Sequence, residues 1–183
     1  MEDQKVRATS VNNLYACGFT LRESEYVIFG GSKPVIGRSN ILIDVPIEQV
    51  FDFVGHHFFD NYPRWSSEVI ELKRNFEGPL RVGSQLQQIR ADHGRRTQST
   101  FVVTQFEENL SLAFEDIAKK YRCFYGFERP MNPSNATQLT FIFELPVLEP
   151  FLRPFEKRVR AAVEKGADNN TRDIKALVEA HRA

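Results

Sequence analysis

The sequence predicts an α+β fold in which a curved antiparallel sheet of six or seven strands wraps around one long C-terminal helix. Between residues 70 and 145, short apolar stretches alternate with polar residues at a period of two, and turn residues separate them. This pattern is typical of strands joined by hairpins. From Leu148 onward, apolar residues recur at helical spacing. Because such a helix must bury its apolar stripe, we expect it to pack on one face of the sheet.

One strand and two short helices are expected before the hairpins. Alternating residues at 41–45 predict a strand that ends at Pro46. Pro46 suits the first turn of a helix, where its missing N–H costs no hydrogen bond, and this helix is expected to fade at Gly55. The aromatic residues within 58–62 indicate a second short helix that ends before Pro63.

Six more strands and the final helix complete the expected domain. The helix should extend over about 30 residues, or about 45 Å. Its start is confined by Pro150 and Pro154, because proline is not tolerated deep inside a helix. The expected strands comprise residues 70–76, 84–91, 97–106, 110–116, 121–128 and 137–145.

The chain of 183 residues suits one domain of ordinary size. We expect this domain to comprise residues 36–183 and to be preceded by an N-terminal extension, residues 1–35. The apolar run at 26–29, followed by two glycines, could add a strand to the sheet. The extension is not expected to form a separate domain.

Charge and composition argue against several classes of protein. Lys plus Arg and Asp plus Glu each number 24, so the formal net charge is 0, and no long-range field attracts the chain to nucleic acid. No stretch approaches the roughly 18 consecutive apolar residues of a membrane span, and the N-terminus does not resemble a signal peptide. Cys17 and Cys123 are too far apart for a disulfide framework. We therefore expect a cytoplasmic protein that binds no nucleic acid and has no integral membrane association.

A straight helix does not contact a strongly curved sheet along its whole length, so we expect a cavity between the two. The 16 phenylalanines suit either the lining of that cavity or a large solid core. Trp65 is expected to plug the end of the core, and lining the mouth of the cavity is the alternative. The residues expected to bind a ligand are Tyr62, Trp65, Gln88, Phe101, Tyr125, Phe127, Leu139, Phe141, Phe143, Phe151, Phe155 and Val159.

Several stretches of the chain carry a family pattern. They are residues 41–51 (ILIDVPIEQVF), Trp65, Val69, residues 82–84 (VGS) and residues 177–179 (LVE). Together they resemble the START-like superfamily, also called SRPBCC, which contains the polyketide cyclase/dehydrase family and the birch-pollen-allergen proteins. The resemblance excludes the N-terminal extension, because in these families the first strand begins almost at once.

The resemblance implies a helix-grip fold, in which the sheet grips the C-terminal helix around a hydrophobic cavity. Members bind lipids, sterols, hormones or polyketides, or catalyse cyclisation and dehydration of such molecules. The first expectation is therefore binding of a small hydrophobic ligand that is lipid-, aromatic- or polyketide-like. An enzyme of the cyclase/dehydratase type is the alternative, and a solid-core interaction module is a third possibility. No cofactor is expected, and the protein could be a monomer or a homodimer.

Few polar residues suggest catalysis. Arg90 and Tyr125 could act on a bound ligand, as could Glu115 from a neighbouring strand, although Arg90 and Glu115 could instead form an internal salt bridge. His57 could act as a general base with Asp60, or both could lie in a solvated turn. No metal site is expected, because adjacent histidines point in different directions on a helix and no other cluster of ligands is present.

Overall fold

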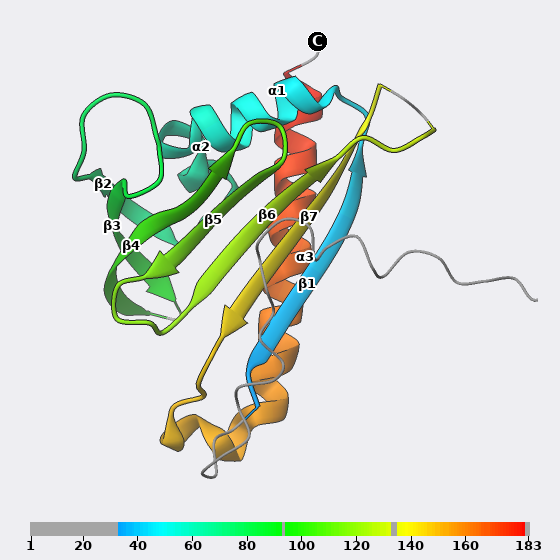
Figure 1. The fold of residues 1–183 in the computed structure, drawn as a ribbon. Helices are drawn as coiled ribbons and strands as arrows, with labels where there is room; N and C mark the ends of the chain where they lie inside the picture. The colour runs from blue at the N-terminus through cyan, green and yellow to red at the C-terminus, as the bar shows by residue number, and fades with distance from the viewer. Residues whose placement is uncertain (1–32, 93, 133–134, 182–183) are drawn as a thin grey trace, which may run out of the picture. The chain divides into compact units, whose positions relative to one another are not determined.

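The described residues form a seven-stranded antiparallel sheet and a long C-terminal helix (Figure 1). The computed structural model describes residues 33–92, 94–132 and 135–181, so the predicted strand at 26–29 lies outside the described residues. The α+β fold and the six predicted hairpin strands are confirmed. The strands are β1 (Val35–Ile43), β2 (Val69–Arg74), β3 (Gln85–Asp92), β4 (Arg95–Glu107), β5 (Ser111–Asp116), β6 (Arg122–Glu128) and β7 (Thr137–Leu145).

The strand order in the sheet is β1-β7-β6-β5-β4-β3-β2. Strands β2 to β7 therefore form a meander, while the first strand pairs with the last, from Val35 opposite Leu145 to Ile43 opposite Thr137. The pairing of β4 with β5 shifts register after Val103, and an irregularity of this kind increases the local twist of a strand. The sheet bends around the C-terminal helix (Figure 1).

Two short helices follow β1, as predicted: α1 (Ile47–Phe51) and α2 (Phe58–Trp65), joined by a π-helical turn, η2 (Asp52–His56). Helix α2 continues through Pro63, so the prediction that it ends before this residue is wrong. Pro63 lies near the end of the helix and removes one backbone donor there. The N–H of Ser66 still donates to the carbonyl oxygen of Tyr62 at 3.1 Å, which keeps the last turn closed.

The C-terminal helix is shorter than predicted. Its first part, η3 (Pro150–Phe155), is a 3-10 helix that contains both prolines, and the regular helix α3 (Glu156–Ala180) has 25 residues. Proline lacks the N–H that the α-helical ladder requires, so the ladder begins only after Pro154. The buried residues of α3 occur only from the middle of the helix onward: Ala167, Thr171, Ile174 and Val178.

Helix α3 lies directly against β1. A Cβ atom on Gly37 would lie 2.5 Å from the carbonyl oxygen of Val163, so the close approach of helix and strand requires a residue without a side chain. Further along the same contact, the hydroxyl groups of Ser39 and Thr171 form a hydrogen bond of 2.9 Å. These contacts fix α3 along an edge strand of the sheet.

Helices α1 and α2 close one end of the inner face of the sheet with aromatic rings. The ring centroid of Phe58 lies 4.5 Å from that of Phe114, which lies 5.3 Å from that of Phe101. The rings of Phe51 and Phe127 lie 5.1 Å apart. We call these five buried residues the aromatic end. Such ring pairs contribute about 0.5–1.5 kcal/mol each beyond the burial of their surface.

Candidate functional site

A group of polar side chains lies on the inner face of the sheet. Alternation along β3 places Leu86, Gln88 and Arg90 on the same face, and Leu86 belongs to the hydrophobic core. Gln88 is only 2% exposed, so its amide needs partners from the protein or from a ligand. The partners come from α2, from β4 and from the residue just before β6. We call the resulting set the inner polar cluster: Tyr62, Gln88, Arg90, Ser99 and Tyr121.

Gln88 connects the members of this cluster. Its carbonyl oxygen accepts a hydrogen bond of 3.1 Å from the hydroxyl of Tyr62. Its amide nitrogen donates to the hydroxyl oxygens of Ser99 at 3.1 Å and Tyr121 at 2.9 Å. The last two hydroxyls also lie 3.1 Å from each other. A buried amide with both hydrogens and its carbonyl oxygen engaged holds its neighbours in fixed positions.

Arg90 lies at the edge of the cluster, with its side chain 28% exposed. Its Nη1 donates to the hydroxyl oxygen of Tyr62 and to that of Ser66, both at 3.2 Å. Its Nη2 lies 3.5 Å from a carboxylate oxygen of Glu68. Arg90 therefore forms an ion pair with Glu68, and the prediction that its partner is Glu115 is wrong.

Glu115 cannot take part in the cluster, because it points to the opposite face of the sheet. Its neighbours on β5, Leu112 and Phe114, belong to the core, and alternation turns the residue after Phe114 outward. There Glu115 pairs with Lys119. The prediction of Glu115 as a catalytic candidate within the cavity is therefore wrong.

The environment of the cluster keeps its hydroxyl groups protonated. Burial raises the pKa of Tyr62, and the cation of Arg90 partly opposes this effect because positive charge favours the phenolate. Burial also raises the pKa of Tyr121. At neutral pH both phenols therefore keep their hydrogen: Tyr62 donates its hydrogen to Gln88, and Tyr121 can donate its own to Ser99 or to a ligand oxygen.

Next to Tyr121, the inner face combines accessible surface with a poorly hydrated environment. The rings of Tyr121 and Phe143 are stacked with centroids 5.7 Å apart, and both residues are half-buried. Cys123 is also half-buried, yet burial raises the pKa of its thiol to about 12. Tyr121, Cys123 and Phe143 are therefore the part of this face that keeps some accessible surface.

Other predicted ligand-binding residues occupy the interior. Tyr125 lies with its ring 4.7 Å from that of Phe141, and its hydroxyl oxygen accepts a hydrogen bond of 3.4 Å from Nδ2 of Asn170. Trp65 packs between the rings of Phe53 and Phe58, at 5.7 and 5.8 Å. The remaining buried members of the predicted set are Phe101, Phe127 and Leu139.

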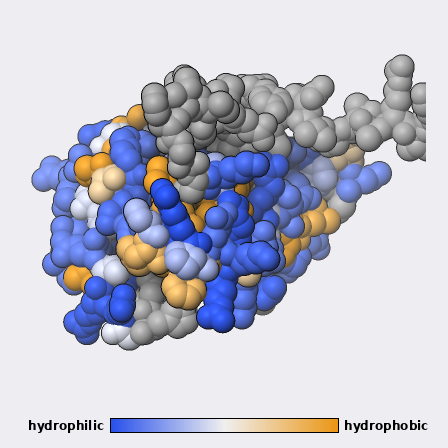
Figure 2. Space-filling model, turned by 90° about the horizontal axis from the view of Figure 1, so that it is seen from below, coloured by the Kyte–Doolittle hydropathy of each residue, from blue (hydrophilic) through white to orange (hydrophobic). Residues whose placement is uncertain are grey.

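Two residues of the predicted set are exposed, and a third on the same segment is half-buried. Phe151 is 65% exposed and Phe155 is 52% exposed, so their assignment to the cavity wall is wrong. Val159 is half-buried. The physical reason is that η3 and the first turns of α3 extend beyond the sheet (Figure 1), so none of the strands that the structure describes covers them. In the view from this side, hydrophobic residues lie among mainly hydrophilic ones (Figure 2).

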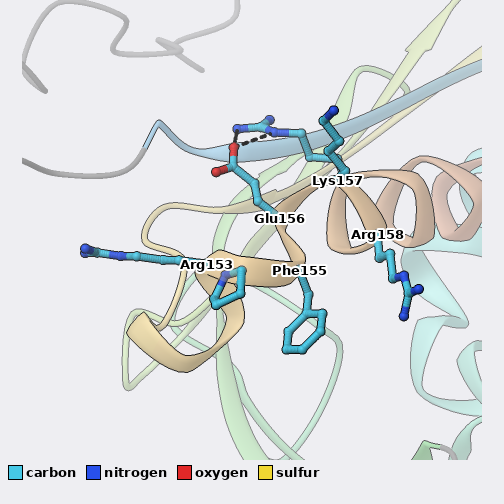
Figure 3. A pocket seen from close by; sticks show the side chains of 7 residues that line it. Arg153, Phe155, Glu156, Lys157 and Arg158 are labelled. Atoms are coloured by element: carbon cyan, nitrogen blue, oxygen red, sulfur yellow. Dashed lines mark hydrogen bonds and ion pairs between the residues drawn. The ribbon is translucent and has the colours of Figure 1, made fainter.

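A surface hollow occurs at this exposed segment (Figure 3). Its described lining residues all come from residues 153–160 and are mainly charged. Phe155 and Arg158 extend away from the helix (Figure 3), and Glu156 is engaged by Arg160 through hydrogen bonds of 2.8 and 2.9 Å. Since one helical segment supplies these side chains, the hollow is a weaker candidate site than the inner face.

The predicted pairing of His57 with Asp60 is also wrong. Nδ1 of His57 lies 3.2 Å from a carboxylate oxygen of Asp52, and both side chains are more than half exposed. The π-helical turn places the two residues next to each other, on the surface of the molecule. His57 therefore contributes nothing to the inner face.

Sequence reasoning left three interior polar residues out of the predicted site. Ser99 and Tyr121 share the alternation of the inward residues on their strands, so their positions carried a signal. Asn170 lies three residues after Ala167 and four before Ile174, in line with the buried face of α3. Helical spacing could therefore have identified Asn170, but the prediction followed apolar residues only and left this polar residue out.

Two kinds of feature are absent from the part of the chain that the structure describes. No group of three or more His, Cys, Asp and Glu residues could hold a metal ion there. None of the helices has the combination of length and apolarity that is needed to cross a membrane.

The sequence matches the model of one protein family, described as polyketide cyclase/dehydrase and lipid transport, over residues 36–179. No curated protein is significantly similar to the chain.

Solved structures share the fold at low sequence identity. A protein from Thermus thermophilus is 15% identical, with a TM-score of 0.67 over 81% of this chain and 99% of its own. The Zhui aromatase/cyclase from Streptomyces is 9% identical, with a TM-score of 0.66 over 82% and 96%. A START superfamily protein from Mycobacterium smegmatis is 16% identical, with a TM-score of 0.63 over 79% and 97%. These similarities confirm the helix-grip fold.

Proposed function

Since the chain belongs to the polyketide cyclase/dehydrase and lipid transport family, we propose that its helix-grip domain, residues 36–183, binds a small hydrophobic ligand between the sheet and α3. The observation that carries this proposal is the inner polar cluster, whose members from α2, β3, β4 and the residue before β6 are connected by hydrogen bonds. Apolar walls with a few convergent polar groups are typical of sites for small molecules.

The chemistry of the cluster indicates which ligands fit. Arg90 presents a partly exposed cation, and Tyr62 and Tyr121 present phenols that stay protonated. Both kinds of group favour oxygen atoms with full or partial negative charge, such as carbonyl, enolate or carboxylate oxygens. The aromatic rings nearby favour a flat apolar body. An aromatic or polyketide-like molecule with oxygen atoms at one end combines both properties.

Titration with 1-anilinonaphthalene-8-sulfonate tests this proposal, because the probe joins apolar rings to one anionic group. We expect the folded protein to bind the probe and Arg90→Gln to bind it about tenfold more weakly. One charge-assisted hydrogen bond contributes about 1.5–3 kcal/mol, which corresponds to at least that factor.

Arg158→Gln is the matched control, since Arg158 is exposed on α3, and it should bind the probe as the unmodified protein does. Circular dichroism should show that both variants are folded. Equal affinities of the two variants would contradict the placement of the ligand at the inner polar cluster.

Native mass spectrometry of the purified protein would identify the ligand class directly. We expect a co-purifying molecule that is lost in Phe143→Asp, because an unpaired charge beside Tyr121 would cost several kcal/mol in this apolar setting. Retention of the molecule by a folded Phe143→Asp protein would show that Phe143 does not face the ligand.

A second candidate function is catalysis of cyclisation with loss of water. The observation that favours it is the hydrogen bond from Arg90 to Tyr62. In an aldol cyclisation, a carbon between two carbonyls gives a proton to a base from solvent and attacks a third carbonyl carbon, whose oxygen becomes negatively charged. Once protonated, this oxygen leaves as water when the attacking carbon gives up its second proton to solvent. A phenol held by a guanidinium group could donate a proton to that oxygen. Faster disappearance of a synthetic tetraketide thioester with the protein than with Tyr62→Phe would support this function, and equal rates would contradict it.

A further inference from the structure

The hydrogen bonds of the inner polar cluster all run in one direction. Nη1 of Arg90 donates to the hydroxyl oxygen of Tyr62, whose own hydrogen is donated to Oε1 of Gln88. Nε2 of Gln88 in turn donates to the hydroxyl oxygens of Ser99 and Tyr121. A guanidinium group has donors but no acceptor, so the chain of hydrogen bonds begins at Arg90. It ends at Ser99 and Tyr121, which we call the hydroxyl pair.

One hydrogen of the hydroxyl pair is left over. Both hydroxyl oxygens accept from Gln88, and these two bonds use neither hydroxyl hydrogen. The oxygens of Ser99 and Tyr121 lie 3.1 Å apart, and this contact uses the hydrogen of one of them. Among the described residues, neither hydroxyl makes a further hydrogen bond. The pair therefore retains one hydrogen for which the described part of the protein supplies no acceptor.

The contact within the hydroxyl pair also determines the orientation of the Gln88 amide. If this amide were turned over, both hydroxyls would donate to its oxygen, and two oxygens 3.1 Å apart would have no hydrogen between them. With Nε2 toward the pair, the same contact is a hydrogen bond. The spare hydrogen therefore belongs to the hydroxyl pair and not to Tyr62.

The spare hydrogen lies where the inner face keeps accessible surface. Both members of the hydroxyl pair are half-buried, whereas Gln88 is only 2% exposed. The ring of Tyr121 is stacked on that of Phe143, which is also half-buried. Burial raises the pKa of Tyr121, and the carboxylate of Asp116 raises it further, so its hydrogen is retained at neutral pH. An apolar ligand that contacts Phe143 can therefore bring an oxygen atom to a hydroxyl that is still protonated.

We propose that the hydroxyl pair donates its spare hydrogen to a carbonyl oxygen of the ligand, a proposal that rests on the function proposed above. The hydroxyl that carries this hydrogen accepts from both Gln88 and its partner, so its two lone pairs are used and it acts only as a donor. A carbonyl oxygen needs only a donor, whereas a ligand hydroxyl would also need an acceptor for its hydrogen. Hydrogen bonds that run in one direction polarise one another, which strengthens the last donor of the chain.

Two probes of nearly equal shape test this inference: 2-acetylnaphthalene and 2-isopropenylnaphthalene, which has a CH2 group in place of the carbonyl oxygen. We expect calorimetry to show about fivefold tighter binding of the ketone, which is the usual effect of one hydrogen bond. Infrared difference spectra with a 13C-labelled carbonyl provide a second readout. The C=O band of the bound ketone should lie at lower frequency than in hexane, because a hydrogen bond weakens the C=O bond.

Gln88 is the positioning residue, and Gln88→Glu reverses the end of the chain with little change in shape. An ionised carboxylate has acceptors only, so it draws the hydrogens of both Ser99 and Tyr121 inward and leaves none for a ligand. A neutral carboxyl group still has one donor, so the spare hydrogen stays free. We therefore expect the preference for the ketone to fall towards unity as pH rises through the range, about pH 5 to 9, in which a buried carboxyl group ionises. The carbonyl band should move towards its frequency in hexane over the same range.

Gln87→Glu is the matched control, since Gln87 is the next residue on β3 and its side chain lies on the opposite face of the sheet. This variant and the unmodified protein should keep the preference at every pH in the range. A purely structural role of Gln88 would give no such dependence on pH. Circular dichroism should show that both variants are folded.

The outcomes separate this inference from the proposed function. If both probes bind the unmodified protein equally, or if the carbonyl band lies at its frequency in hexane, the role of the hydroxyl pair is overturned while ligand binding stands. The same holds if Gln88→Glu keeps the full preference throughout the pH range. If Gln88→Glu does not fold, the carbonyl band in the unmodified protein decides. If neither probe binds, the proposed function is overturned and the role of the hydroxyl pair with it.

Discussion

The two ends of the inner face use the same kind of residue in different ways. At the aromatic end, rings from α1, α2 and three strands pack at centroid distances of 4.5 to 5.3 Å and exclude water. Towards the start of α3, Phe143 is half-buried beside Tyr121, and Phe155 is more than half exposed. This difference shows that an aromatic residue becomes part of the hydrophobic core only where another helix or strand covers it.

The first prediction compares Phe114 with Phe155. Phe114→Ala should lower the free energy of unfolding by about 3–5 kcal/mol, because it opens a cavity among the rings of Phe58 and Phe101. Phe155→Ala should change it by less than about 0.5 kcal/mol, as an exposed substitution does. Urea denaturation of the two variants measures both values. Similar losses in the two variants would contradict the division of the molecule into a packed and an open end.

The second prediction concerns Cys123, at the boundary between the two ends. Its pKa is raised by burial from its ordinary value near 9 to about 12, so the thiolate fraction at pH 8 should be about 10³-fold lower than in the unfolded chain. Alkylation by iodoacetamide should be slowed by a similar factor in a Cys17→Ser background. Unfolding in urea should restore the rate, and a fast reaction of the folded protein would show that water enters freely.

The same pKa shift determines how stability depends on pH. The thiol of Cys123 ionises near pH 9 in the unfolded chain and near pH 12 in the folded one, so its contribution is intact below pH 9 and is lost as pH rises towards 12. Cys123→Ala should therefore reduce the loss of stability in this range. An unchanged pH profile of the variant would assign alkaline unfolding to other groups, such as the buried tyrosines.

The third prediction concerns the fit of α3 to β1. Gly37→Ala should destabilise the fold by about 1–3 kcal/mol through overpacking, since its Cβ atom would collide with the carbonyl oxygen of Val163. Thermal unfolding is the measurement. An unchanged melting temperature would mean that strand and helix can separate without cost.

The smallest effect is expected at Gly166, which serves as the opposite control. A Cβ atom at this position within α3 would have no neighbouring atom within 4 Å, so Gly166→Ala should stabilise the protein by about 1 kcal/mol through helix propensity alone. A loss of stability would indicate that the open space beside Gly166 is needed for another contact.

Most of the fold was predictable because it depends on local patterns. Alternation identified the strands, helical spacing identified α3, and the chain positions of Pro46 and Gly55 placed the short helices. The errors occurred where a local rule met a tertiary contact. Helix α2 continues through Pro63, and the turn after it is closed by two hydrogen bonds of Ser66: its N–H donates to Tyr62, and its carbonyl oxygen accepts from Val69. The regular helix α3 begins late because the 3-10 helix before it contains two prolines.

The candidate site was predictable only in part, for a related reason. Alternation placed Gln88 and Arg90 on the inner face, as the structure does. It could not show that Glu68 rather than Glu115 pairs with Arg90, because that choice depends on where β2 and α2 lie. It also could not separate the buried Phe141 from the exposed Phe151, since both belong to apolar stripes.

The order and type of the elements, and the face that each residue presents, followed from the chain alone, because hydrogen bonding and periodicity act between near neighbours. Only the folded arrangement decided which faces are covered, which polar atoms meet and which polar atoms are left without partners. Burial and electrostatic interactions depend on distances between atoms that lie far apart in the sequence. The hydrogen bond between Asn170 and Tyr125, which are 45 positions apart, shows this dependence directly.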